Sequence, residues 1–142
     1  MIRILAASWV LAFAALIASG AIAQQPAGPA ATGELDGLSF VGPTGPRGEP
    51  AERADERVEF AGGRLRSSVC EQMGFPPNAY RTTREGDAVR FESLLVSAKD
   101  GTIRWEGVVR GGVLEATYTW TKERLLWTTR RDYWFKGMPV GR

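Results

Sequence analysis

Hydrophobic and polar residues alternate most regularly over residues 103–120, on both sides of the glycine pair Gly111-Gly112. Such alternation predicts two β-strands with one buried face, and two adjacent glycines predict a tight turn because both can adopt positive φ. Pairing Arg110 with Val113 then places every inward residue opposite another inward residue. The expected inward pairs are Val109 with Leu114, Gly107 with Ala116, Trp105 with Tyr118, and Ile103 with Trp120.

The strand that precedes this hairpin is expected over residues 88–98, before the turn Lys99-Asp100-Gly101. A two-residue loop would turn the charged side chains of Arg90 and Glu92 inward, and burying them would cost several kcal/mol each. A three-residue loop with a left-handed Gly101 leaves both in solvent, so we expect this loop. The register that follows pairs Leu95 with Trp105 and Phe91 with Val109.

The rest of the chain predicts shorter elements. Strands are expected over residues 35–41, 80–84 and 131–137, with a second glycine hairpin at Gly62-Gly63 that places Phe60 opposite Leu65. The segment Cys70-Glu71-Gln72-Met73, followed by Gly74, predicts one short helical turn at 70–74, after which Phe75 is expected to pack inward. The Pro- and Gly-rich segment 42–55 is expected to be a flexible loop.

The expected fold is all-β: an antiparallel up-and-down meander of about eight strands, closed into a barrel, with a β-sandwich as the alternative. Closure favours the barrel because it removes both exposed sheet edges. An interior of this size holds side chains or one small ligand. The expected inward residues are Phe60, Leu65, Val69, Phe91, Leu95, Ile103, Trp105, Val109, Leu114, Tyr118, Trp120, Tyr133 and Phe135.

The N-terminal segment has the composition of an export signal. Arg3 precedes an apolar run over 4–18, and Ala21-Ile22-Ala23 is a small-x-small cleavage motif. Because the run is shorter than the ~20 residues that span a bilayer, a signal peptide over 1–23 is favoured over a membrane anchor. We therefore expect a disordered leader over 24–33, one barrel domain over 34–142, and a location in the periplasm or outside the cell with no integral membrane span after cleavage.

Composition argues against several kinds of chemistry. The chain of 142 residues has no histidine, and its 18 basic and 16 acidic residues nearly balance. A nucleic-acid-binding protein should show a concentrated basic surplus, so no nucleic acid partner is expected. Without an imidazole base or a His-based metal site, we expect no cofactor, no metal and no catalysis. For the single cysteine, Cys70, a buried apolar role, a reactive thiol and a link to a second chain remain open.

Arginines recur on outward strand positions, at Arg81, Arg84, Arg90, Arg104, Arg110, Arg130 and Arg131. Acidic residues stand beside them on the same face, so cross-strand ion pairs in contact with water are the simplest interpretation. The alternative is a surface that faces lipid headgroups or a cell-wall polymer.

Short strands, glycine turns and inward aromatic residues together resemble the calycin group, that is, lipocalins and avidin-type barrels. The segment Leu35-Asp36-Gly37-Leu38-Ser39-Phe40 is similar to the Gly-x-Trp opening of lipocalins, with Phe in place of Trp and one extra residue. The segments SSVCEQMGF, IRWEGVVRGG and DYWFKG also resemble small exported bacterial proteins of unassigned role. The resemblance implies a binding protein for a small apolar or amphipathic molecule, and it transfers no site residue.

Two functions from different classes are compatible with these patterns. The first is a non-enzymatic barrel that binds a small apolar or amphipathic ligand in its interior, with the candidate pocket residues Phe91, Trp105, Tyr118, Trp120 and Tyr133. The second is a filled barrel that acts as a protein-interaction or cell-envelope structural module. It would meet an envelope protein through the loop at 42–55, the bend at 70–77 and the outward Trp134.

Overall fold

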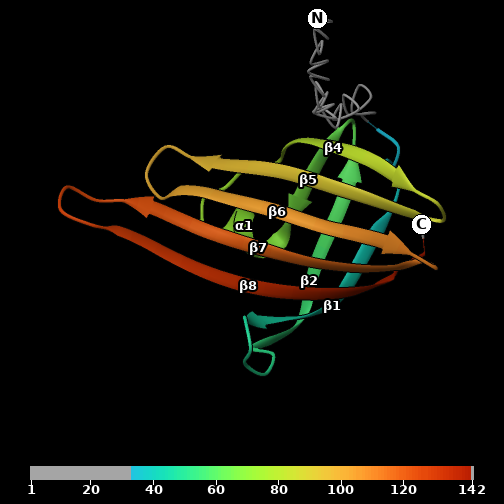
Figure 1. The fold of residues 1–142 in the computed structure, drawn as a ribbon, viewed down its shortest axis with the longest axis horizontal. Helices are drawn as coiled ribbons and strands as arrows, with labels where there is room; N and C mark the ends of the chain where they lie inside the picture. Colours follow the sequence, from blue (N-terminus) through green and yellow to red (C-terminus); the bar gives the residue numbers. More distant parts are fainter. Residues whose placement is uncertain (1–32, 142) are drawn as a thin grey trace, which may run out of the picture.

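The computed structural model describes residues 33–141, and it confirms an all-β fold of eight antiparallel strands in a closed barrel (Figure 1). This architecture fits the calycin-like fold that the sequence resembles. The expected signal peptide and all but the last residue of the expected leader lie outside the described residues. The elements are β1 (Ser39–Pro46), β2 (Arg53–Ala61), β3 (Arg64–Ser67), α1 (Ser68–Gln72), β4 (Asn78–Glu85), β5 (Ala88–Ser97), β6 (Gly101–Arg110), β7 (Val113–Glu123) and β8 (Thr128–Pro139).

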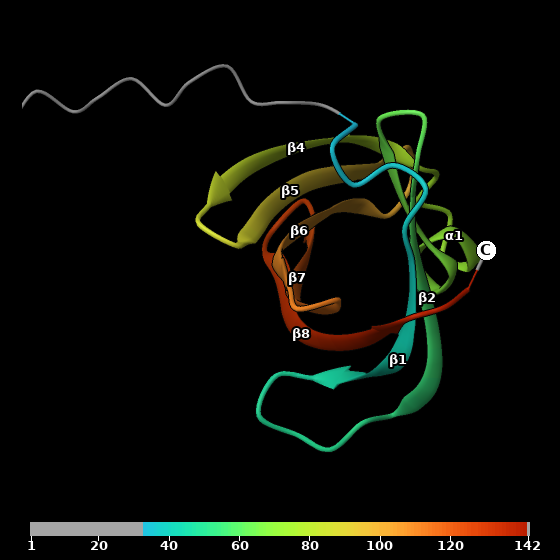
Figure 2. The same ribbon diagram turned by 90° about the vertical axis from the view of Figure 1, so that its right-hand side faces the viewer.

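The barrel closes where the last strand returns to the first. β8 pairs with β1 in antiparallel fashion, with Val41 opposite Met138 and Thr44 opposite Phe135 (Figure 2). Each strand of the described residues therefore has two neighbours, although β3 and β4 share only the pairs Arg64–Ala79 and Leu65–Asn78.

The central hairpin has the predicted register. β6 and β7 pair with Arg110 opposite Val113, and the four expected inward pairs are all present. Gly111 and Gly112 both have positive φ, as the two-residue turn requires. Gly62 and Gly63 form the equivalent turn between β2 and β3, with Phe60 opposite Leu65.

The register between β5 and β6 was predicted wrongly by two residues. Ser97 pairs with Gly101, so the three-residue connection is 98–100 rather than 99–101. Leu95 therefore lies opposite Ile103 instead of Trp105, and Phe91 lies opposite Gly107 instead of Val109. A shift of two keeps every side chain on its expected face, because the side-chain period of a strand is two. Leu95 and Phe91 are accordingly buried, and Arg90 and Glu92 are exposed.

The segment 42–55 was predicted as a loop, but most of it belongs to strands. β1 runs through Pro46 and β2 begins at Arg53, which leaves a connection of residues 47–52. The inward alternation that starts at Phe40 continues through Gly42 to Thr44, so a buried face persists within the Pro/Gly-rich sequence. The first strand also begins later than the expected residue 35.

Residues 33–38 form a turn that packs beside the β2–β3 hairpin. Leu35 is buried, and its backbone N–H donates a hydrogen bond to Tyr80 Oη at 3.0 Å. Tyr80 Oη in turn donates to Asp36 Oδ1 at 2.7 Å, and the backbone N–H of Gly63 donates to Asp36 Oδ2 at 2.9 Å. Leu38, at the end of this turn, is 37% exposed.

The expected short helix is confirmed as α1, two residues earlier than predicted. Ser67 caps it, accepting a hydrogen bond from the backbone N–H of Cys70 at 3.1 Å, and Gly74 follows with φ of +88°. Val69 lies in this helix rather than on the strand face where it was expected. Phe75 is buried, as expected.

Candidate functional site

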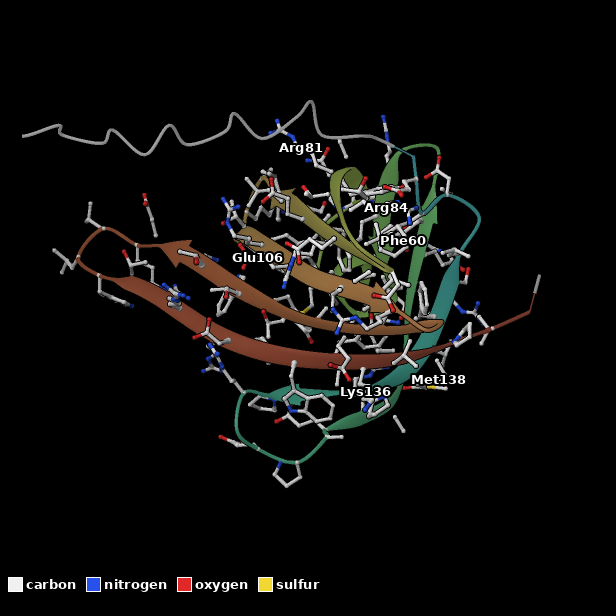
Figure 3. The ribbon with its side chains drawn as sticks, turned by 45° about the vertical axis from the view of Figure 1, so that its right-hand side comes forward. Phe60, Arg81, Arg84, Glu106, Lys136 and Met138 are labelled. Atoms are coloured by element: carbon white, nitrogen blue, oxygen red, sulfur yellow. The ribbon has the colours of Figure 1, made fainter. Side chains whose placement is uncertain are left out.

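The interior of the barrel divides into a filled half and a half that contains a cavity. In the filled half, beside the turn at 33–38, Phe60 makes edge-to-face contacts with Phe40, Tyr80 and Phe91, at centroid distances of 6.3, 4.9 and 5.1 Å. These rings occupy the space that a ligand would need. Figure 3 shows Phe60 on β2, where it is 1% exposed.

Three aromatic rings form a stack across β6, β7 and β8. Trp105 lies 4.3 Å from Tyr118 with an interplanar angle of 17°, and Tyr118 lies 5.0 Å from Tyr133 with an angle of 10°. The stack follows from the register, because Trp105 faces Tyr118 and Tyr118 faces Tyr133 across adjacent strands. The stack forms one flat apolar wall inside the barrel.

A cavity of about 140 Å³ lies against this wall. It is mainly apolar, and it opens on the side where the connection between β1 and β2 meets α1. Its lining residues are Thr44, Gly45, Glu52, Arg53, Val69, Met73, Ile103, Tyr118, Trp120 and Tyr133.

Three of the five predicted pocket residues line this cavity: Tyr118, Trp120 and Tyr133. Trp105 is 0% exposed and lies behind Tyr118, so it supports the wall. Phe91 is 4% exposed and packs against Phe60 in the filled half. Alternation placed all five on the inward face, but it does not specify how deep along the barrel each lies.

Hydrogen bonds fix two of the cavity's aromatic side chains. Thr44 Oγ1 donates to the carbonyl oxygen of Trp134 at 2.7 Å, so the 2.8 Å contact between Thr44 and Tyr118 requires the tyrosine hydroxyl to donate. Burial raises the pKa of Tyr118, which keeps this hydroxyl protonated at neutral pH. Trp120 Nε1 donates to the carbonyl oxygen of Asp100 at 2.7 Å. The rings therefore present a preformed surface.

A buried carboxyl group, missed in the sequence, anchors α1 beside the cavity. Glu56 is 0% exposed. Its carboxyl oxygens accept hydrogen bonds from Ser67 Oγ at 2.6 Å, Ser68 Oγ at 3.2 Å and the backbone N–H of Val69 at 3.0 Å. Burial raises the pKa of Glu56 more than these hydrogen bonds and the charge of Arg53 lower it. The arrangement is that of a helix anchor, since every donor belongs to the start of α1.

Cys70 is buried in the same region. It is 0% exposed, and burial raises the pKa of its thiol to about 11. A thiol with this pKa is almost entirely protonated at neutral pH, and the thiolate is the reactive form. Of the three roles open at the outset, the structure supports the buried apolar one.

We expect native Cys70 to react with a thiol-specific disulfide reagent about a hundredfold or more slower than in the unfolded chain, because both burial and protonation protect it. The measurement is the absorbance of the released thiol with and without urea. Equal rates in the two states would show that α1 opens freely and that the thiol is available for chemistry.

Two features of the outer surface bear on the alternative roles. Four of the seven outward arginines form ion pairs: Arg84 with Glu34, Arg90 with Glu85, Arg110 with Asp87 and Arg130 with Asp132. Glu34 and Asp87 lie in turns, whereas Glu85 and Asp132 lie on β4 and β8. Figure 3 shows Arg81, Glu106 and Lys136 on the outer wall. Trp134 is half-buried, because its Nε1 donates to the carbonyl oxygen of Glu49 at 2.9 Å and so ties the β1–β2 connection to β8.

Within residues 33–141, no group of three or more His, Cys, Asp or Glu side chains is arranged to hold a metal ion. No helix in that same range is long and apolar enough to cross a bilayer. Comparison of the chain with family models, with curated proteins and with solved structures gives no match.

Proposed function

We propose that this protein is an exported, non-enzymatic β-barrel that binds a small amphipathic ligand in the cavity beside Tyr118, Trp120 and Tyr133. The observation that carries the proposal is the contrast between the two halves of the barrel. One half is filled by interlocking rings, whereas the other keeps about 140 Å³ free beside a flat aromatic wall. A polar rim around a mainly apolar cavity is typical of small-molecule sites.

The size of the cavity limits what it can hold. An apolar cavity of about 150 Å³ in a protein core accommodates one benzene molecule. The ligand would therefore insert a single ring or a short aliphatic end, stacked or packed on Tyr118 and Tyr133. Its remaining part would stay at the opening, where Glu52 and Arg53 provide charges of both signs.

We expect phenol, indole and medium-chain alcohols to change the tryptophan fluorescence in a saturable way, because Trp120 lines the cavity. Ligands of this size should bind with dissociation constants on the order of 0.1–1 mM. Replacing Val69 with phenylalanine fills the cavity from α1 and should weaken binding by about tenfold or more, a loss of ~1.4 kcal/mol.

The matched control is Val96→Phe, which makes the same substitution on the outer wall of β5, where Val96 is 49% exposed. This variant should bind as the parent protein does. A panel without any saturable response, or equal affinities for the Val69→Phe protein and its parent, would contradict the proposed site.

A further inference from the structure

The connection between β7 and β8 exposes three consecutive apolar residues. Leu125 is 98% exposed, Leu126 is 83% exposed and Trp127 is 60% exposed. Isolated apolar residues are common on protein surfaces, but a contiguous apolar group indicates a contact surface. We call the residues 124–127 the tip loop.

The geometry of the hairpin directs the tip loop away from the barrel. The ladder between β7 and β8 continues to the pair Glu123–Thr128, and the backbone N–H of Arg124 donates to the carbonyl oxygen of Trp127 at 2.8 Å. Figure 1 shows this hairpin extending beyond the neighbouring β5–β6 connection. The Arg124 guanidinium lies over the Trp127 ring at 5.9 Å, so it holds the indole at the side of the turn.

Basic residues outnumber acidic residues around the tip loop. Residues 122–132 contain four basic residues, Lys122, Arg124, Arg130 and Arg131, against two acidic residues, Glu123 and Asp132. Lys122 pairs with Asp100 at 2.9 Å and Arg130 pairs with Asp132 at 3.5 Å, whereas Arg124 and Arg131 form no ion pair within residues 33–141. The whole chain has 18 basic and 16 acidic residues. Its small excess of positive charge therefore lies at this end of the β7–β8 hairpin. A cationic collar behind an apolar tip is complementary to an anionic lipid surface.

We propose that the tip loop docks the protein on a bilayer that contains anionic lipids. Leu125, Leu126 and Trp127 enter the interfacial region, where tryptophan is favoured because its ring is amphipathic. Arg124 and Arg131 remain at the level of the phosphate groups and attract them. A second copy of the same hairpin fits less well, since two cationic collars would repel each other.

This inference stands without the proposed ligand, but it bears on the cavity. Trp120 and Tyr133, which line the cavity, lie on the two strands that lead to the tip loop. A barrel docked through this hairpin would therefore hold its binding strands next to the lipid headgroups.

The test uses the protein as it is purified from the cells that express it from the full-length sequence. It is mixed with vesicles of phosphatidylcholine alone or of phosphatidylcholine and phosphatidylglycerol. We expect binding to the anionic vesicles, measured by cosedimentation, to weaken by about tenfold or more in the double variant Leu125→Ser/Leu126→Ser. It should also weaken as the salt concentration rises to about 1 M, because the electrostatic part is screened. Brominated lipid should quench the fluorescence, and the variant Trp127→Phe should lose that quenching.

The matched control is Leu94→Ser/Val96→Ser, which removes two apolar side chains from the outer wall of β5, where they are 38% and 49% exposed. It should bind vesicles as the parent does. Equal binding by the tip-loop variant and its parent, or lipid quenching that survives in Trp127→Phe, would overturn the proposal. Absence of vesicle binding together with concentration-dependent dimerisation would assign the tip loop to a second copy instead.

Discussion

Replacing Gly42 with alanine should open the barrel between β1 and β8 and lower the free energy of unfolding by about 3 kcal/mol. The added Cβ would lie 2.0 Å from the backbone carbonyl oxygen of Lys136, far inside van der Waals contact. Backbone atoms cannot move aside as a flexible side chain can. Because the ladder between Val41–Met138 and Thr44–Phe135 spans this point, the strain falls on the seam that closes the barrel.

The measurement is urea-induced unfolding, followed by circular dichroism and tryptophan fluorescence. Gly141→Ala is the matched control, because its new Cβ would meet nothing within 4 Å and its φ is not positive. Ligand binding should weaken together with stability in the Gly42→Ala protein, since Thr44 on the same strand positions Tyr118. An unchanged unfolding midpoint would mean that β1 and β8 can separate slightly at no cost.

The face of each strand could be predicted from the sequence, because alternation with period two is a local property. Gly111-Gly112 then fixed the register of β6 and β7 without further information. The β5–β6 connection shows the limit of this reasoning. Alternation cannot distinguish registers that differ by two residues, so Leu95 could be placed inside but not opposite Ile103.

Tertiary context decided the two larger differences. Glycine and proline in 42–55 predicted a loop, yet Gly42 is needed where the β8 backbone approaches, and an added Cβ at Gly45 would lie 2.5 Å from the carbonyl oxygen of Pro50. Glu56 has the same parity as Phe60 and Val58, so alternation did point it inward. A charged side chain is rarely buried without partners. The three groups that donate hydrogen bonds to this carboxylate come from the start of a helix, which no strand pattern reveals.

The candidate pocket was predicted only in part, and the reason is again that alternation does not fix positions along the barrel. Alternation brought Tyr118, Trp120 and Tyr133 to one face, and the register of β7 and β8 brought Tyr118 and Tyr133 to one level. The position of Phe91 along the barrel depends on the tilt and stagger of all strands together, which no local pattern contains. The tip loop lacks alternation, so only the structure shows that its apolar side chains are exposed.

Replacing Glu56 with alanine should lower the free energy of unfolding by about 3 kcal/mol, because it leaves the donors of Ser67, Ser68 and Val69 without their acceptor. It should also weaken ligand binding, since Val69 and Met73 line the cavity and this carboxyl anchors the start of α1. Glu56→Gln keeps the shape and one acceptor oxygen, so we expect a smaller loss of about 1–2 kcal/mol. If both variants unfolded at the urea concentration of the parent, the carboxyl group would not anchor α1.

The pH dependence separates the charge of Glu56 from its shape. Burial raises its pKa in the folded protein above the ordinary value of 4.5, so the folded state binds the proton more tightly than the unfolded state. The stabilisation that results is complete below pH 4.5 and is lost as the pH rises through the folded pKa. The difference in unfolding free energy between the parent and Glu56→Gln should therefore shrink from acid to neutral pH, measured by urea unfolding at a series of pH values. A difference that grew with pH would instead mean that the three hydrogen bonds outweigh burial and hold the carboxylate charged inside the barrel.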